Sequence, residues 1–164
     1  MPSRRTLLRT ISGVASCGIA GCTSLDRGVD GYVQLKSIEA RGGNDQRPFE
    51  TVLRVMLSSP PGASKPKLTH HQDQWTDRFD TPHRPEVSDA LHEELTRAFD
   101  TVKYVIGICS PSWADGGESV GCINDSTTRE DFNLVQVHDR VRASTDGASL
   151  SIRSVDGSWT FESG

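Results

Sequence analysis

The side chains best suited to chemistry in this sequence are two late cysteines, Cys109 and Cys122. In an exported protein, such an even pair is typical of a disulfide, which stabilises the fold by restricting the unfolded chain. A thiolate metal site would need further Cys or His ligands at short spacing. A catalytic thiol would need a base that the sequence does not place. We therefore predict that Cys109 and Cys122 form a disulfide.

Histidines form the second candidate group, together with neighbouring aspartates. They are His70, His71, His83 and His92. Imidazole and carboxylate groups can bind a divalent metal, and three ligands would leave a coordination position open for a hydrolytic water. The spacing matches no motif with a mechanism, such as H-E-x-x-H. Solvent-exposed side chains are the simpler interpretation. The alternative is a metal-assisted hydrolase that uses residues 70–92, with His70, His71 and His83 as candidate ligands.

Other catalytic signatures are missing from the sequence. It contains no G-x-S-x-G, no glycine loop for a phosphate, and no pair of carboxylates at a catalytic spacing. We predict no cofactor, and the sequence favours a binding or structural role over catalysis.

The composition argues against a nucleic-acid partner. The chain has 18 basic and 22 acidic residues, a formal net charge of −4. Removing residues 1–21 would take away three arginines and no acid, which moves the net charge from −4 to −7. Binding phosphates requires clustered Lys and Arg, and no such cluster appears. An acidic surface with more arginine than lysine resembles that of halophilic prokaryotic proteins, in which net charge maintains solubility.

The first 22 residues have the order of a targeting signal. Arg4, Arg5 and Arg9 form a positive head without an acid, and residues 11–20 are mostly small or apolar. Small residues then precede Cys22. This order is the signature of a removed signal peptide. The apolar stretch is too short to cross roughly 30 Å of hydrocarbon, which needs about 20 apolar residues.

Two motifs within this signal resemble those of exported prokaryotic lipoproteins. Residues 3–9, S-R-R-T-L-L-R, resemble the twin-arginine export motif, with Arg4 and Arg5 as the pair. Leu7 stands where that family more often has Phe. Residues 19–22, I-A-G-C, resemble a lipobox. The resemblance covers only these residues, and it implies that Cys22 receives a diacylglyceryl group and becomes the first residue after cleavage. Two acyl chains suffice for stable anchoring.

These observations predict a simple organisation. Residues 1–21 form the signal peptide, 22–30 the lipidated Cys and a short tether, and 31–164 a single domain. A tether of about eight residues reaches only about 26 Å, so the domain should lie close to the membrane. We expect a cell-membrane protein, lipid-anchored on the extracytoplasmic face through Cys22. An envelope protein or a small-molecule ligand is the expected further partner.

The predicted domain is α+β, with an antiparallel sheet of about five to six strands and one long amphipathic helix packed on it. Apolar residues repeating at three and four positions predict the helix over residues 86–102. Alternating or continuous apolar runs and turn signals predict the strands: 32–39, 49–57, 103–110, 131–143, 148–155 and 159–161. The order is β-β-loop-α-β-β-β-β. A half-open barrel and a β-sandwich are alternative shapes.

Two loops are the expected contact surfaces of this domain. The connection over residues 58–84 is unusually long for a compact domain, and such loops are often functional. The second loop lies between Cys109 and Cys122 and would be held by the disulfide. Functional residues occur preferentially on loops that a rigid scaffold positions.

Overall fold

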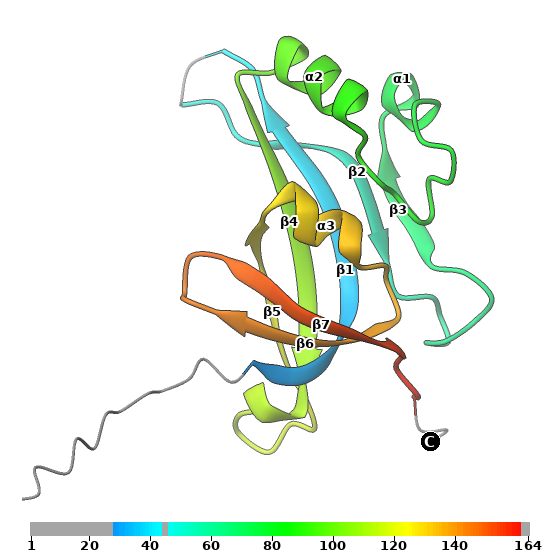
Figure 1. Cartoon of the computed structure of the whole chain (residues 1–164), viewed down its shortest axis with the longest axis vertical. Coiled ribbons are helices and arrows are strands. Elements are labelled where there is room, and N and C mark those ends of the chain that lie inside the picture. Colours follow the sequence, from blue (N-terminus) through cyan, green and yellow to red (C-terminus); the bar gives the residue numbers. More distant parts are fainter. Residues whose placement is uncertain (1–27, 44–45, 162–164) are drawn as a thin grey trace, which may run out of the picture.

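A curved antiparallel sheet of seven strands dominates the computed structural model, which describes residues 28–43 and 46–161 (Figure 1). The strands are β1 Val29–Arg41, β2 Glu50–Met56, β3 Lys67–His71, β4 Thr101–Ser110, β5 Gly121–Thr127, β6 Asp139–Thr145 and β7 Leu150–Ser158. The helices are α1 Asp73–Thr76, α2 Asp89–Ala98 and α3 Arg129–Leu134, with a 3-10 turn, η1, at Pro111–Trp113. The predicted signal peptide, Arg4, Arg5 and Cys22 lie outside the described residues. β1 begins at Val29, within the stretch predicted as the tether.

β1 organises the sheet because it pairs with three other strands. β4 runs antiparallel along most of its length, β2 pairs with its C-terminal half, and β6 pairs with its first residues. The strand order is β3-β2-β1-β4-β5, with the β6–β7 hairpin attached at the start of β1. One bulge in β1, at Gln34, and one in β2, at Val52, allow this bending, since a bulge increases the local twist.

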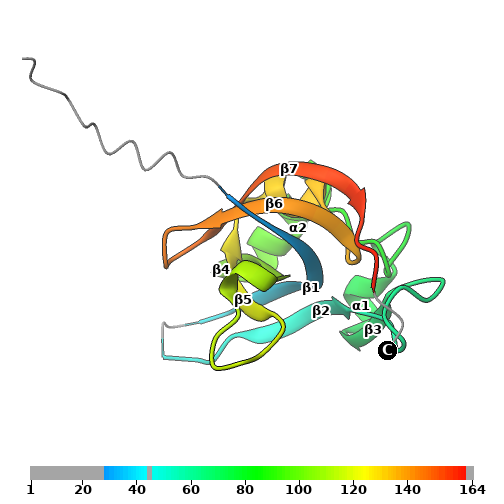
Figure 2. The same ribbon diagram turned by 90° about the horizontal axis from the view of Figure 1, so that it is seen from below.

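The hairpin folds over until β7 approaches the opposite edge of the sheet (Figure 2). Thr127 Oγ1 in β5 donates a hydrogen bond to the backbone O of Leu150, 2.8 Å away, at the start of β7. α3 packs against both β4 and β7. The sheet is therefore a partly closed barrel whose core is filled from β1, β2, β4, β6 and α3. Its fully buried apolar residues include Val33, Ile38, Leu53, Val55, Ile106, Ile108, Phe132 and Val141.

The prediction of one long helix over residues 86–102 is wrong. α2 has 10 residues, Asp89–Ala98, and is the longest helix in the described part of the chain. It begins late because the Asn133 side chain bonds both Val87 N (2.8 Å) and Val87 O (2.9 Å), which keeps the preceding segment extended. Ser88 then caps the helix by accepting from Leu91 N. The molecule is accordingly mostly β, with short helices.

Further boundaries differ from the sequence prediction. The predicted loop 58–84 contains β3 and α1, and the predicted loop between Cys109 and Cys122 contains η1 and the start of β5. The predicted strand 131–143 starts as α3, which Thr128 caps by accepting from Asp131 N. β7 continues to Ser158, and residues 159–161, which were predicted as a separate strand, lie outside the strands.

The remaining strand predictions are confirmed. The predicted strands 32–39 and 49–57 pair antiparallel, and 103–110 lies inside the sheet between β1 and β5. The turn at Asp146 and Gly147 joins the β6–β7 hairpin. Among the described residues, no helix has the length and apolar character needed to span a membrane.

Lys36, in the middle of β1, is fully buried on the core face of the sheet. Its Nζ donates to Pro85 O (2.7 Å), Val135 O (2.8 Å) and Gln136 Oε1 (3.3 Å). It also lies 4.1 Å from the centroid of the Phe132 ring. Three acceptors match the three donors of an ammonium group. Lys36 thus ties the segment before α2 and the segment after α3 to the central strand.

Burial lowers the pKa of Lys36 from 10.5 to about 7, whereas the carboxylates of Glu86 and Asp139 act to raise it. In the unfolded chain the side chain keeps its ordinary pKa. Between pH 7 and 10.5 the unfolded state therefore binds a proton that the folded state lacks. By linkage, the free energy of unfolding contributed by this group rises with pH through that window.

Lys36→Met should remove this pH dependence while keeping the length of the side chain. At about pH 9 the variant should also be less stable by about 1–3 kcal/mol, because two buried carbonyl groups lose their donor. Urea unfolding at several pH values between 7 and 10.5 measures both effects. Lys103→Met, at an exposed position, is the control. If the free energy of unfolding of Lys36→Met depended on pH as it does in wild type, the pH dependence would not come from Lys36.

Candidate functional site

Residues of the loop between β2 and β3 line two hollows. This loop and the end of β7 lie at the same end of the molecule (Figure 1). The first hollow, of about 410 Å³, is lined by Ser58, Ser59, Ala63, Lys65, Pro66, Lys67, Leu68 and His83. The second, of about 340 Å³, shares Ala63 and Pro66, and it adds Gly62, Ser64, Arg84, Val137, His138, Asp139, Ser158 and Trp159. We call these two hollows together the 58–68 groove. A third hollow on Trp159, of about 540 Å³, is lined by Asp30, Arg140, Asp156 and Thr160.

His138 fixes the floor of the groove. Its φ of 82° is positive, which no other non-glycine residue in the described part of the chain shows. Its N–H donates to Val33 O (2.9 Å) and its O accepts from Trp159 N (2.9 Å). The ring Nε2 accepts from Ser58 N at 3.2 Å. Such a backbone conformation persists only where the surroundings over-determine it. His138 therefore joins β1, the loop after β2 and the segment at Trp159.

Ser58 and His138 form a contact pair without the features of an activated nucleophile. The Ser58 hydroxyl donates to Pro60 O at 2.7 Å and accepts from Ala63 N at 3.0 Å. His138 Nε2 lies 3.2 Å from the same hydroxyl but already accepts from Ser58 N. An activated serine needs a base that is free to take its proton. This pair holds the loop in shape.

Basic side chains without ion pairs gather along the groove. Lys65, Lys67 and Arg84 line it, and none has a carboxylate partner among the described residues. Paired arginines are Arg54, Arg78, Arg97, Arg129 and Arg142. Among the described residues that line the groove, Asp139 is the single acid, and its carboxylate accepts from Gln136 N at 2.6 Å. The groove is therefore locally positive in a chain that is negative overall.

An aromatic cluster holds Trp159 at the end of the groove. The Tyr32 ring lies 5.0 Å from the rings of both Trp159 and Phe161. The Phe161 ring in turn lies 6.1 Å from His138. Such tilted and edge-on contacts stabilise aromatic clusters. The indole of Trp159 is half-buried and lines both the second and the third hollow. It thus presents a fixed, partly exposed ring to a ligand.

The histidines predicted as metal ligands do not converge. His70 and His71 lie on β3, where His71 Nδ1 is 3.3 Å from Asp73 Oδ1. His83 lines the groove, and His92 on α2 contacts the Tyr104 hydroxyl at 2.7 Å. Within residues 28–43 and 46–161, no three His, Cys, Asp or Glu side chains form a group that could hold a metal ion. The geometry gives the metal-assisted hydrolase no support.

No family model, curated protein or solved structure matches this chain. One fold can carry many unrelated functions, so the function has to be argued from the chemistry of the site. The groove and the disulfide supply that argument.

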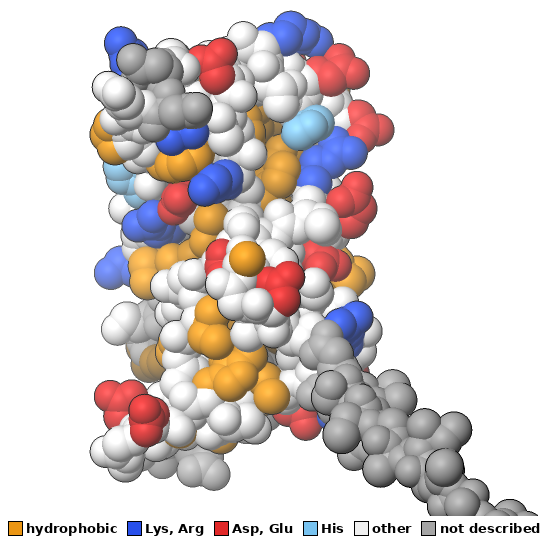
Figure 3. All heavy atoms as spheres, turned by 90° about the vertical axis from the view of Figure 1, so that its left-hand side faces the viewer, with side chains coloured by type: hydrophobic (Ala, Val, Ile, Leu, Met, Phe, Trp, Pro, Cys, Tyr) orange, Lys and Arg blue, Asp and Glu red, His pale blue; other side chains and the backbone are white. Residues whose placement is uncertain are grey.

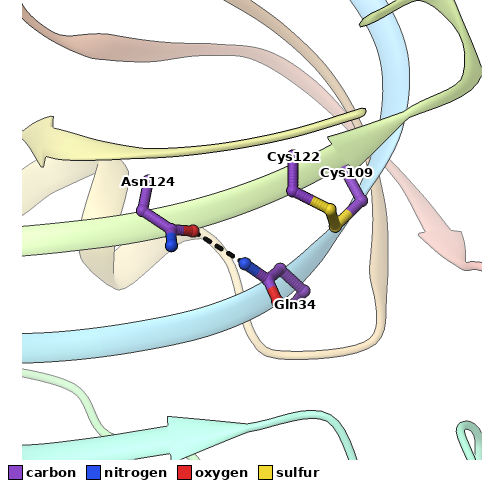
Figure 4. Close-up of a disulfide and its surroundings, with 4 residues drawn as sticks. All are labelled: Gln34, Cys109, Cys122 and Asn124. Atoms are coloured by element: carbon purple, nitrogen blue, oxygen red, sulfur yellow. Dashed lines mark hydrogen bonds between the residues drawn. A yellow bond between two sulfur atoms is a disulfide. The ribbon is translucent and has the colours of Figure 1, made fainter. Parts of the chain in front are cut away.

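The predicted disulfide is confirmed (Figure 4). Cys109 on β4 and Cys122 on β5 are directly opposite each other in register, with Cys109 buried and Cys122 exposed. Beside them, Gln34 Nε2 donates to Asn124 Oδ1 at 2.7 Å. The bond therefore fastens the edge strand β5 to the centre of the sheet.

The side of the molecule turned away from the groove has a different character (Figure 3). Acidic and basic side chains are intermixed on its upper part, and hydrophobic side chains are exposed below them. Ion pairs between exposed side chains contribute little stability and leave no local excess of charge. The groove is therefore the better candidate for recognising a charged ligand.

His138 and Trp159 were not recognised as site residues from the sequence. No local motif marks His138, because its partners Val33 and Ser58 are distant in the chain. A usable signal was present in the lysines. The sequence has four, and Lys65 and Lys67 flank Pro66 within the long loop.

Replacing both cysteines by alanine should lower the free energy of unfolding by about 3 kcal/mol, since the closed loop restricts the unfolded chain. Chemical denaturation of wild type and Cys109→Ala/Cys122→Ala measures this difference. Adding a reducing agent should abolish the difference in free energy of unfolding, because the reduced wild type also lacks the disulfide. Peptide mapping of the unreduced protein should recover Cys109 and Cys122 in one linked fragment. Recovery of two unlinked peptides would contradict the structure.

Burial also lowers the pKa of His138 below its ordinary 6.5, although the Asp139 carboxylate acts in the opposite direction. On acidification through 6.5 the unfolded state therefore takes up a proton before the folded state does, and stability falls. His138→Asn should remove this loss, since asparagine tolerates positive φ. Near neutral pH it should cost about 1 kcal/mol through the lost acceptor for Ser58 N. Urea unfolding near neutral pH and at a pH below 6.5 measures both effects. His70→Asn, at an exposed position, is the control.

Proposed function

We propose that this chain is a lipid-anchored extracytoplasmic binding protein that takes its ligand in the 58–68 groove. The motifs around Arg4, Arg5 and Cys22 support export and anchoring. The disulfide supports an oxidising compartment, since such bonds are rare in the reducing cytosol.

The observation that carries the binding role is the rigid, locally positive groove itself. Hydrogen bonds to Val33, Ser58 and Trp159 hold His138 beneath it. Its walls present unpaired cations and an indole ring, which are groups that recognise a ligand. They present neither a metal-ligand set nor an activated serine, as hydrolysis would require.

The tether places this surface near the membrane. If Cys22 is lipidated, residues 23–28 reach roughly 20 Å at about 3.3 Å per residue before β1 begins. The start of β1 and residues 158–161 lie at the same end of the molecule (Figure 1). The groove therefore belongs to the membrane-facing half, where envelope components are concentrated.

Anchoring is tested by mass spectrometry of the membrane-extracted protein. The mature N-terminus should be Cys22 carrying a diacylglyceryl group, whereas Cys22→Ser should be released from the membrane fraction. Washing with high salt should not release the wild type, because acyl chains bind through burial of CH₂ groups. An unmodified Cys22 or an intact Met1 in the membrane-bound protein would refute the anchor.

Binding is tested with Trp159 as the reporter. Defined neutral and acidic oligosaccharides and acidic and basic peptides are titrated against the protein while tryptophan fluorescence is recorded. We expect at least one class to change the signal in wild type and in Trp113→Phe, but not in Trp159→Phe. Trp113 lies in η1, outside the groove. If no class binds by fluorescence or calorimetry, the binding role is wrong.

A further inference from the structure

We infer that the ligand of the 58–68 groove is an acidic saccharide, a short chain of sugar rings that carries carboxylate or sulfate groups. This inference rests on the binding role proposed above, and it specifies the chemical class of the ligand.

The charges of the groove require an anion. Lys65 and Lys67 line the first hollow and Arg84 the second, and none is neutralised by a carboxylate of the described chain. Charge-assisted hydrogen bonds from Lys and Arg to an anionic oxygen are roughly twice as strong as neutral ones, and Arg can bind both oxygens of a carboxylate. Asp139, the only acid among the lining residues that the structure describes, already accepts from Gln136 N.

The ring of Trp159 selects among anions. Its indole lines the second hollow beside Arg84 and is held from behind by Tyr32 at 5.0 Å. An aromatic ring buries the apolar face of a ligand while leaving its polar edge wet. A pyranose ring has such a face, formed by its C–H groups, whereas the carboxylates of an acidic peptide are carried on flexible stems. A neutral saccharide would use the indole but leave the three cations unmatched.

The arrangement also suits an oligomer better than a single sugar. The two hollows are of about 410 and 340 Å³, and Ala63 and Pro66 belong to the linings of both. Lys65 and Lys67 serve one hollow, and Arg84 and Trp159 serve the other. The hydroxyl groups of Ser64 and Ser158 on the second hollow can bond sugar hydroxyls. Successive anionic rings would therefore meet a cation in each hollow.

The test uses the mature protein in detergent micelles and isothermal calorimetry. The probes are an oligogalacturonate, a neutral malto-oligosaccharide of equal length, an oligoglutamate peptide and inorganic sulfate. The first variant is Lys65→Gln/Lys67→Gln. Its matched control is Arg47→Gln/Lys103→Gln, which removes the same charge from the β1–β2 connection and from β4. That connection and the start of β4 lie at the end of the molecule away from the β2–β3 loop (Figure 1). Circular dichroism checks that each variant is folded.

We expect the oligogalacturonate to bind, and to bind more tightly than the other three probes. In the Lys65→Gln/Lys67→Gln variant the Kd should rise about tenfold or more, which corresponds to the loss of one charge-assisted contact. The control should change by less than about twofold, since distant charges are screened. Arg84→Gln should weaken oligogalacturonate binding without affecting the neutral probe. Wild-type affinity should fall as salt is raised.

Three results would overturn the inference. Equal affinity for the neutral saccharide would show that the cations do not take part, and tighter binding of oligoglutamate would show an acidic-peptide site. Both would leave the binding role intact. An equal loss in the control variant would show that the effect comes from net charge and not from the groove. If no probe of any class binds, the binding role and the inference fail together.

Discussion

The fold depends on one ionisable side chain in the core. Lys36 lies at the centre of β1, and its amino group holds the backbone of Pro85 and Val135 against the sheet. Neither segment has a regular partner strand there, so their carbonyl groups would be buried without a donor if Lys36 were absent. A buried unpaired carbonyl costs more than an average hydrogen bond contributes. Lys36 therefore allows two segments without regular secondary structure to pack against the core with their carbonyl groups hydrogen-bonded.

The same residue shows why periodicity does not predict this fold fully. Strict alternation from Val33 would put Lys36 on the opposite face of β1, where a charge faces solvent. The bulge between Val33 and Leu35 shifts the register by one position, and Lys36 then shares the core face with Ile38. A bulge is set by long-range pairing with β4, so local sequence cannot reveal it. Strands with continuous or regularly alternating apolar residues, β2 and β4, could be predicted, because their patterning agrees with their pairing.

Errors in the predicted elements have a related cause. The edge strands β3 and β5 are short and contain no buried residue, so they need no apolar alternation and carry none. The α3 segment was predicted as a strand from Val135, Val137 and Val141, although Thr128 and Asp131 form a capping pair at its start. Likewise, Ser88 marked the true start of α2 inside a longer apolar stripe. Cap residues were better guides than periodicity at these boundaries.

Lys36 also connects the core to the groove. Pro85, one of its acceptors, adjoins Arg84, and Gln136 precedes Val137 and His138, which line the same hollow as Arg84. The contacts of Lys36 therefore hold in place two of the segments that line the groove. The coupling is also electrostatic, because the positive charge of Arg84 contributes to lowering the pKa of Lys36. An anion bound at Arg84 would offset that repulsion and favour the protonated Lys36, whose three donors match its three acceptors. Ligand binding and the integrity of the core are thus expected to stabilise each other, since the same backbone segments serve both.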